Sequence, residues 1–88
     1  MKNSVKYNGK LNVIGEKIKQ YRELNNLSQA QLSNRLQLLG IYIPKNSIQK
    51  IENGKRTIHE YELAGLSKIL KVSTDKLLEE FLKDGDIK

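Results

Sequence analysis

The sequence predicts an all-α fold, a compact bundle of five short helices. Its 88 residues are enough for one small domain and leave no room for a second. Apolar residues recur at helical spacing, whereas β-branched residues do not alternate with polar ones over any useful length. The chain has a single proline, Pro44, and glycine is sparse.

The first helix is expected over residues 12–25. An apolar stripe runs along it at positions i, i+4 and i+7, the spacing of one helix face. Asn25 and Asn26 end the helix, because asparagine tolerates the left-handed backbone at a helix C-terminus. The stripe consists of Ile14, Ile18 and Tyr21.

A capping box marks the start of the second helix. Ser28 stands at the N-cap and Gln31 follows three residues later, so that each side chain can bond the other's backbone N–H. Gly40 is a natural stop for this helix. Between the two signals the apolar stripe continues through Leu32, Leu36 and Leu39.

The third helix is expected to begin at Pro44 or Lys45 and to end at Asn53. An extended connector, residues 41–44, precedes it, because a residue before proline is pushed away from helical angles. Asn53 and Gly54 form a C-cap pair that closes the helix. The inward-pointing residues of this helix are Ile48 and Ile51.

Two further helices are expected after Arg56. Thr57 and Glu60 have the spacing of a second capping box, and Ser73 or Thr74 caps a short fifth helix. Gly65 inside the fourth helix costs about 1 kcal/mol relative to alanine, which indicates a close helix contact there. The inward residues of these helices are Leu63, Leu66 and Leu70, then Leu77, Leu78 and Phe81.

The charge is unevenly distributed along the chain. Residues 1–56 contain 11 Lys and Arg against 3 Asp and Glu, whereas residues 57–88 contain 5 against 7. Such asymmetry suggests that the basic part meets a polyanion, and the alternative is an ordinary solvated lysine-rich surface. Both ends are polar, so the folded domain is expected at residues 11–82, between a flexible basic arm (1–10) and a flexible tail (83–88).

Composition argues against several kinds of chemistry. The chain has no cysteine, which excludes disulfides and thiolate sites, and His59 is its only histidine, so no metal site is expected. We find no Ser/His/Asp set, glycine-rich phosphate loop or positioned carboxylate pair, and therefore expect no enzyme and no cofactor.

No apolar run approaches the roughly 20 residues of a membrane span, and no signal peptide is visible. The sequence therefore indicates a soluble, cytoplasmic domain without membrane contact.

Two segments carry the most specific pattern in the chain. LSQAQLS stands at residues 27–33, and IQKIENGKR follows at residues 48–56. Together, with one helix before them and two after, they resemble the phage-repressor-like, or XRE, family of helix-turn-helix DNA-binding proteins. The resemblance covers residues 13–78 and implies a lambda-repressor-like domain that binds double-stranded DNA.

The resemblance also assigns roles to individual residues. The third helix would enter the major groove, where Asn and Gln can pair with adenine and Lys can donate to guanine. The implied base-reading residues are Lys45, Asn46, Gln49 and Lys50, and the alternative for each is a solvated helix face. The implied phosphate contacts are Ser28, Gln29, Asn53, Lys55 and Arg56, which position the protein without reading sequence. Arg22 and Glu52 match a structural salt bridge between the first and third helices, and Ser33 matches a small residue at a helix crossing.

Two features depart from the family pattern. The connector at residues 37–44 is longer than the family's usual turn of three or four residues, so the second helix or the connector must be extended. Pro44 also stands where a capping Ser or Thr is expected and cannot cap with its side chain, which leaves Asn46 as the candidate cap. A capping Asn46 would not be free to read a base.

We therefore expect a sequence-specific DNA-binding transcriptional regulator, with repression as the expected sign. A homodimer on a pseudo-palindrome is the expected assembly, with its candidate interface at the end of the fifth helix (Leu78, Phe81 and Leu82). Two alternatives remain open at this point. One is the antitoxin of a toxin–antitoxin pair, which has the same fold and also binds a protein. The other is a basic helical module that binds protein or RNA.

Overall fold

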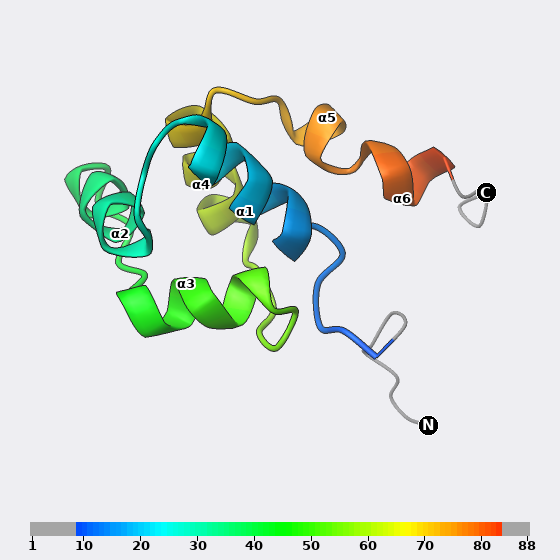
Figure 1. The fold of residues 1–88 in the computed structure, drawn as a ribbon, viewed down its shortest axis with the longest axis horizontal. Helices are drawn as coiled ribbons and strands as arrows, with labels where there is room; N and C mark the ends of the chain where they lie inside the picture. The colour runs from blue at the N-terminus through cyan, green and yellow to red at the C-terminus, as the bar shows by residue number, and fades with distance from the viewer. Residues whose placement is uncertain (1–8, 84–88) are drawn as a thin grey trace.

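The computed structural model describes residues 9–83, and within this range the chain forms six helices and no strand (Figure 1). Residues 1–8 of the expected arm and 84–88 of the expected tail lie outside it. The helices are α1 (Gly15–Leu24), α2 (Gln29–Leu38), α3 (Lys45–Glu52), α4 (Glu60–Leu70), α5 (Thr74–Leu77) and α6 (Glu79–Lys83). The all-α prediction is confirmed.

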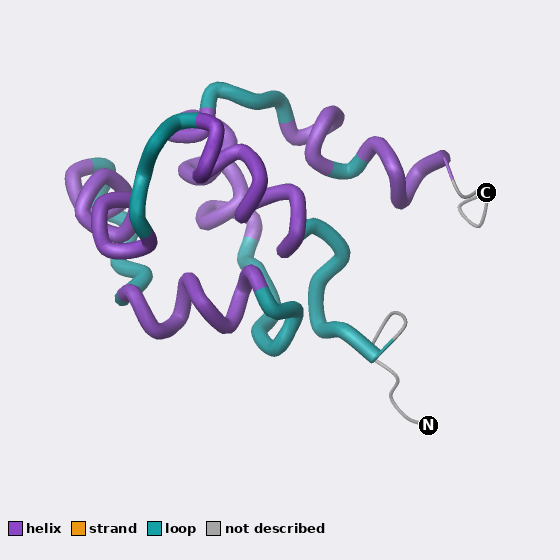
Figure 2. The backbone as a smooth tube through the Cα atoms, viewed as in Figure 1, coloured by secondary structure: helices purple, strands orange, loops and turns teal. Residues whose placement is uncertain are grey.

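The first four helices form the body of the molecule. α3 runs along one edge and packs against both α1 and α2, and α4 packs against the same two helices from behind (Figure 1). α5 and α6 extend sideways from the end of α4 (Figures 1 and 2). An ion pair between Lys17 Nζ and Glu80 Oε2, 3.4 Å long, ties α6 to α1.

One apolar cluster fills the space between the helices, and every helix from α1 to α5 contributes to it. The expected stripes supply most of its members, with Leu39 as an exception, because it is 41% exposed at the end of α2. The buried apolar residues are Ile14, Ile18, Leu27, Leu32, Leu36, Ile43, Ile48, Ile51, Leu66, Leu70, Val72 and Leu77.

The local signals at the ends of α1 and α2 are confirmed. Asn26 takes the left-handed conformation expected after α1, with φ of 58°. The Ser28 Oγ accepts from Gln31 N at 3.0 Å, and Gln31 Oε1 accepts from Ser28 N at 2.8 Å, which completes the capping box. Gly40 follows α2 with φ of 83°, a backbone conformation that suits glycine.

Two expectations about helix ends are wrong. α4 begins after His59 and not at the capping box of Thr57 and Glu60, because Glu62 supplies the box: its Oε1 accepts from His59 N at 3.0 Å. The expected fifth helix is interrupted at Leu78, so that two short helices, α5 and α6, replace one. Of the two expected caps for it, Ser73 is the N-cap and its Oγ accepts from Lys76 N at 3.0 Å.

The long connector between α2 and α3 is held from both sides. It comprises residues 39–44, and α2 itself ends at Leu38. Ile43 is fully buried, and the Ser33 hydroxyl donates to the Ile43 carbonyl at 2.6 Å. A Cβ built on Gly65 would overlap Ile41 Cδ1, the far end of a side chain, which shows that α4 and the connector pack closely at this glycine. The connector therefore fixes where α3 begins.

Candidate nucleic-acid interface

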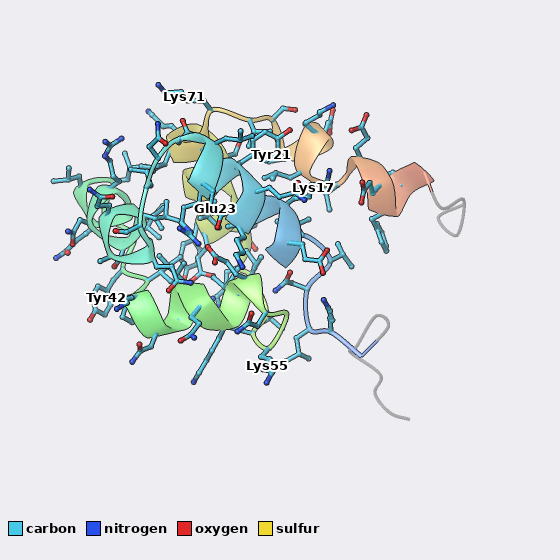
Figure 3. All side chains as sticks on the ribbon, viewed as in Figure 1. Lys17, Tyr21, Glu23, Tyr42, Lys55 and Lys71 are labelled. Atoms are coloured by element: carbon cyan, nitrogen blue, oxygen red, sulfur yellow. The ribbon has the colours of Figure 1, made fainter. Side chains whose placement is uncertain are left out.

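α3 has one face in the core and one in solvent. Ile48 and Ile51 are each 1% exposed, and with Glu52 they hold the inner face against α1 and α2. The outer face carries the four residues that the family resemblance assigns to base reading, and Figure 3 shows their edge of the molecule lined with projecting side chains. All four side chains are exposed and make no hydrogen bond or ion pair with other residues in the described range: Lys45, Asn46, Gln49 and Lys50.

The N-terminus of α3 differs from the expectation. Pro44 is the N-cap, and within the described residues no side chain caps this helix. The expected alternative, Asn46 as the cap, is wrong, because Asn46 lies inside the first turn with its side chain exposed. The free N–H groups of this end therefore face solvent, and the Asn46 amide remains available for an external partner.

A buried ion pair holds α3 from behind. Arg22 Nε donates to Glu52 Oε2 at 2.7 Å and Arg22 Nη2 to Glu52 Oε1 at 3.1 Å, which is the bridge implied by the family resemblance. These hydrogen bonds raise the pKa of Arg22 above its ordinary value, against the opposing effect of burial. The third nitrogen, Arg22 Nη1, donates to the Leu27 carbonyl at 2.8 Å, so α1 is joined to the start of α2 as well.

Ser28 and Gln29 lie at the N-terminus of α2, where free N–H groups and the helix dipole favour an anion. Gln29 Nε2 donates to Glu52 Oε1 at 3.0 Å, which the sequence did not indicate. One of its two N–H groups is therefore taken by the buried pair, and the other is left for an external acceptor. The hydrogen bond fixes Gln29 at the junction of α2 and α3.

The loop after α3 carries the remaining phosphate candidates. Asn53 and Lys55 are exposed, and Figure 3 places Lys55 at the end of α3, on the same edge of the molecule as Tyr42 at its start. Gly54 between them has φ of 75°, which turns the chain back so that Lys55 N donates to Lys50 O at 2.8 Å. The exposed side chains of the loop thus follow directly on the solvent face of α3.

Arg56, also a phosphate candidate, already has a protein partner. Its Nη1 and Nη2 donate to the two carboxylate oxygens of Glu62, each at 2.9 Å, and Nη1 also donates to the Thr57 carbonyl. The hydrogen bonds from Arg56 hold the pKa of Glu62 below its ordinary value, although burial opposes this. The pair closes the loop between α3 and α4, a role that sequence reasoning did not assign to it.

Asn12 has a structural role that the sequence did not indicate. Its Nδ2 donates to the carbonyls of Ile51 and Arg56, each at 2.9 Å, and its Oδ1 accepts from Ile14 N at 3.0 Å. The last contact closes a local turn of a kind that asparagine favours. The two long-range contacts have no sequence signal, because the partners lie 39 and 44 residues away.

Within residues 9–83, no three His, Cys, Asp or Glu side chains gather closely enough to hold a metal ion. None of the helices in that range has the length and apolar character needed to cross a bilayer.

A helix-turn-helix family model matches residues 18–77, more than half of the chain. The chain belongs to the XRE-type helix-turn-helix family. The match includes α2, the connector and α3, so this family's turn is here the six residues 39–44. No curated protein matches the chain.

Two solved structures of the XRE-type protein SinR are similar to this chain. One is SinR, the master regulator for biofilm formation, in complex with DNA: identity is 30%, the TM-score is 0.65, and the match covers 75% of this chain and 98% of that one. The other is the SinR–SinI protein complex, with 29% identity, a TM-score of 0.66, and coverage of 82% of this chain and 66% of that one.

Proposed function

We propose that this protein is a transcription regulator that binds a specific DNA sequence by inserting α3 into the major groove. One observation carries the proposal. The exposed face of α3 presents two lysines and two side-chain amides, and none of the four is engaged by the described part of the protein. In the major groove, amides pair with adenine and lysines donate to guanine acceptors.

The surroundings of α3 suit the same task. Phosphate contacts position a protein on DNA, and the candidates for them lie in segments next to α3. Ser28 and Gln29 lie at the N-terminus of α2, and Asn53 and Lys55 lie in the loop after α3. Arg56 remains a weaker candidate for a phosphate contact, because its charge is already paired with that of Glu62. SinR, which has the same fold, has been crystallised with DNA.

We further propose that the protein acts as a homodimer on a pseudo-palindromic operator and represses by occupying it. Such dimers place their two reading helices about 34 Å apart, one turn of DNA. Leu78, Phe81 and Leu82, around α6, are the proposed contact. Leu82 is 48% exposed and Phe81 is partly buried, so this end of the chain has apolar area that a second copy can cover.

Selection of bound duplexes from a random pool tests this function. We expect the recovered sequences to share one motif, and a dimer predicts two inverted half-sites separated by one helical turn. Recovery of unrelated sequences would contradict sequence-specific binding. Enrichment of a single half-site would contradict the dimer and leave the monomeric reading function intact.

A second candidate, a protein partner as in an antitoxin, is favoured by one observation. A protein of this fold forms the SinR–SinI complex. Affinity purification of this protein from its native cells separates the candidates. A stoichiometric protein partner that persists after nuclease treatment favours the second, and its absence favours operator binding alone.

A further inference from the structure

Residues 10–15, which we call the strap, cross the C-terminal end of α3 and the loop that follows it. Leu11 N donates to the Gly54 carbonyl at 2.8 Å. The aliphatic part of the Lys10 side chain lies over Gly54, so that a Cβ there would stand 2.7 Å from Lys10 Cδ. These contacts hold the strap against the turn that precedes Lys55.

Asn12 makes the central contacts of the strap. The last carbonyls of a helix have no partner inside the helix. Asn12 Nδ2 donates to one of them, Ile51 O, which also accepts from Gly54 N at 3.0 Å. With its second N–H it bonds Arg56 O on the far side of the loop. A single side-chain amide therefore sets the spacing between the end of α3 and the end of the loop.

Gly15 shows how closely the strap and α3 approach each other. A Cβ on this residue would overlap the Ile51 carbonyl oxygen and stand 2.9 Å from the Glu52 carbonyl oxygen. Both obstacles are main-chain atoms, which cannot rotate away as a side chain can. The first residue of α1 therefore rests directly on the backbone of α3.

We propose that Asn12 is a positioning residue for DNA recognition: through its two carbonyl contacts it fixes the pose of α3 and the loop 53–56 together. This deepens the proposed function and rests on it. α3 has only eight residues and no side-chain N-cap, so the contacts at its C-terminal end add to the buried Arg22–Glu52 pair in holding its pose. Asn12 also lies outside residues 18–77, the part of the chain that the family model matches.

The test uses Asn12→Ser in the full chain. A serine at this position can still accept from Ile14 N, but it is too short to reach the carbonyl of Ile51 or that of Arg56. The matched control is Asn25→Ser, because Asn25 Nδ2 also donates to two carbonyls, Tyr21 O at 2.8 Å and Leu70 O at 3.0 Å. That residue lies at the other end of α1, away from the strap.

The first readout is the ratio of affinities for the selected site and a random duplex, at a temperature where both variants are folded. We expect Asn12→Ser to lower this ratio about tenfold, the weight of one good base contact. Asn25→Ser should leave it unchanged. An unchanged ratio in Asn12→Ser, or an equal fall in both variants, would overturn the proposal.

The second readout, amide hydrogen exchange in the free protein, does not depend on DNA. Asn12→Ser should speed exchange at Gly54 and Lys55 more than Asn25→Ser does. Equal effects of the two variants would contradict the positioning role of Asn12 even if the protein binds DNA as proposed. If Asn12→Ser does not fold, hydrogen exchange in the wild-type chain tests the contacts of Asn12 instead. There the side-chain amide protons of Asn12 must exchange more slowly than those of exposed Asn53, and equal rates would reject the contacts.

Discussion

Arg22 on α1 and Glu52 on α3 meet through two hydrogen bonds, 2.7 and 3.1 Å long, with both side chains almost out of solvent. Gln29 on α2 adds a third hydrogen bond to the same carboxylate. One buried charge therefore joins three helices on the inner side of α3. The outer side is left free for a partner, which is the arrangement that a reading helix requires.

Loss of one member of this pair should destabilise the fold. Glu52→Ala leaves the Arg22 guanidinium buried without its counter-charge, and we expect the free energy of unfolding to fall by about 3–5 kcal/mol. Urea unfolding of Glu52→Ala, Arg22→Ala and the double variant measures this. The double variant should lose less than the two single losses added together, and strict additivity would show that the two residues are not coupled.

The part of this architecture that local sequence encodes could be predicted. Helical periodicity found the stripes of α1 to α4, and the capping box of Ser28 and Gln31 depends only on neighbours in the chain. The start of α4 could not be found in this way. Glu62 caps that helix while it is paired with Arg56, and His59 at the N-cap lacks the hydroxyl of the usual pattern, which Thr57 and Glu60 match better.

In the candidate site too, features set by local sequence could be predicted, whereas contacts between distant residues could not. The outer face of α3 follows from the positions of Ile48 and Ile51, since a helix buried on one side must expose the other. The bonds of Gln29 to Glu52 and of Asn12 to the loop after α3 join residues 23 to 44 positions apart. No local pattern encodes such pairs, because only the packing of the helices brings them together.

Lys50→Ala tests whether an individual residue of α3 reads a base. We expect it to cost about 1–3 kcal/mol on the selected site and to relax the preference at one base pair. Lys71→Asn is the control, because Figure 3 shows Lys71 on the opposite side of the molecule from α3, and asparagine tolerates its left-handed backbone. Gel-shift titration against single-base variants of the site measures both. An equal loss on random DNA would mean that Lys50 contributes charge alone.

Lys55→Ala tests the phosphate role of the loop after α3. Because phosphates are the same at every base pair, we expect affinity to weaken about equally on all duplexes. The slope of log affinity against log salt should become shallower by about 1. Titrations at several salt concentrations provide this slope. A loss confined to the selected site would instead assign base reading to Lys55.

The pair of Arg56 and Glu62 predicts a dependence of stability on pH. The pKa of Glu62 is lowered from its ordinary 4.5, chiefly by the hydrogen bonds from Arg56. The stabilisation is therefore fully present above pH 4.5 and is lost as the pH falls through the lowered native value. Melting temperatures from neutral to acid pH should show Glu62→Gln below wild type at neutrality and converging with it in acid. A constant difference would contradict this role.

Dimethyl sulfate footprinting on the selected duplex tests most directly whether α3 lies in the major groove. The reagent methylates guanine N7 in the major groove and adenine N3 in the minor groove, so one gel reports both sides. We predict that the protein protects guanines within its motif and leaves the adenines reactive. Protected adenines with reactive guanines, at full occupancy, would place the protein in the minor groove and contradict the account.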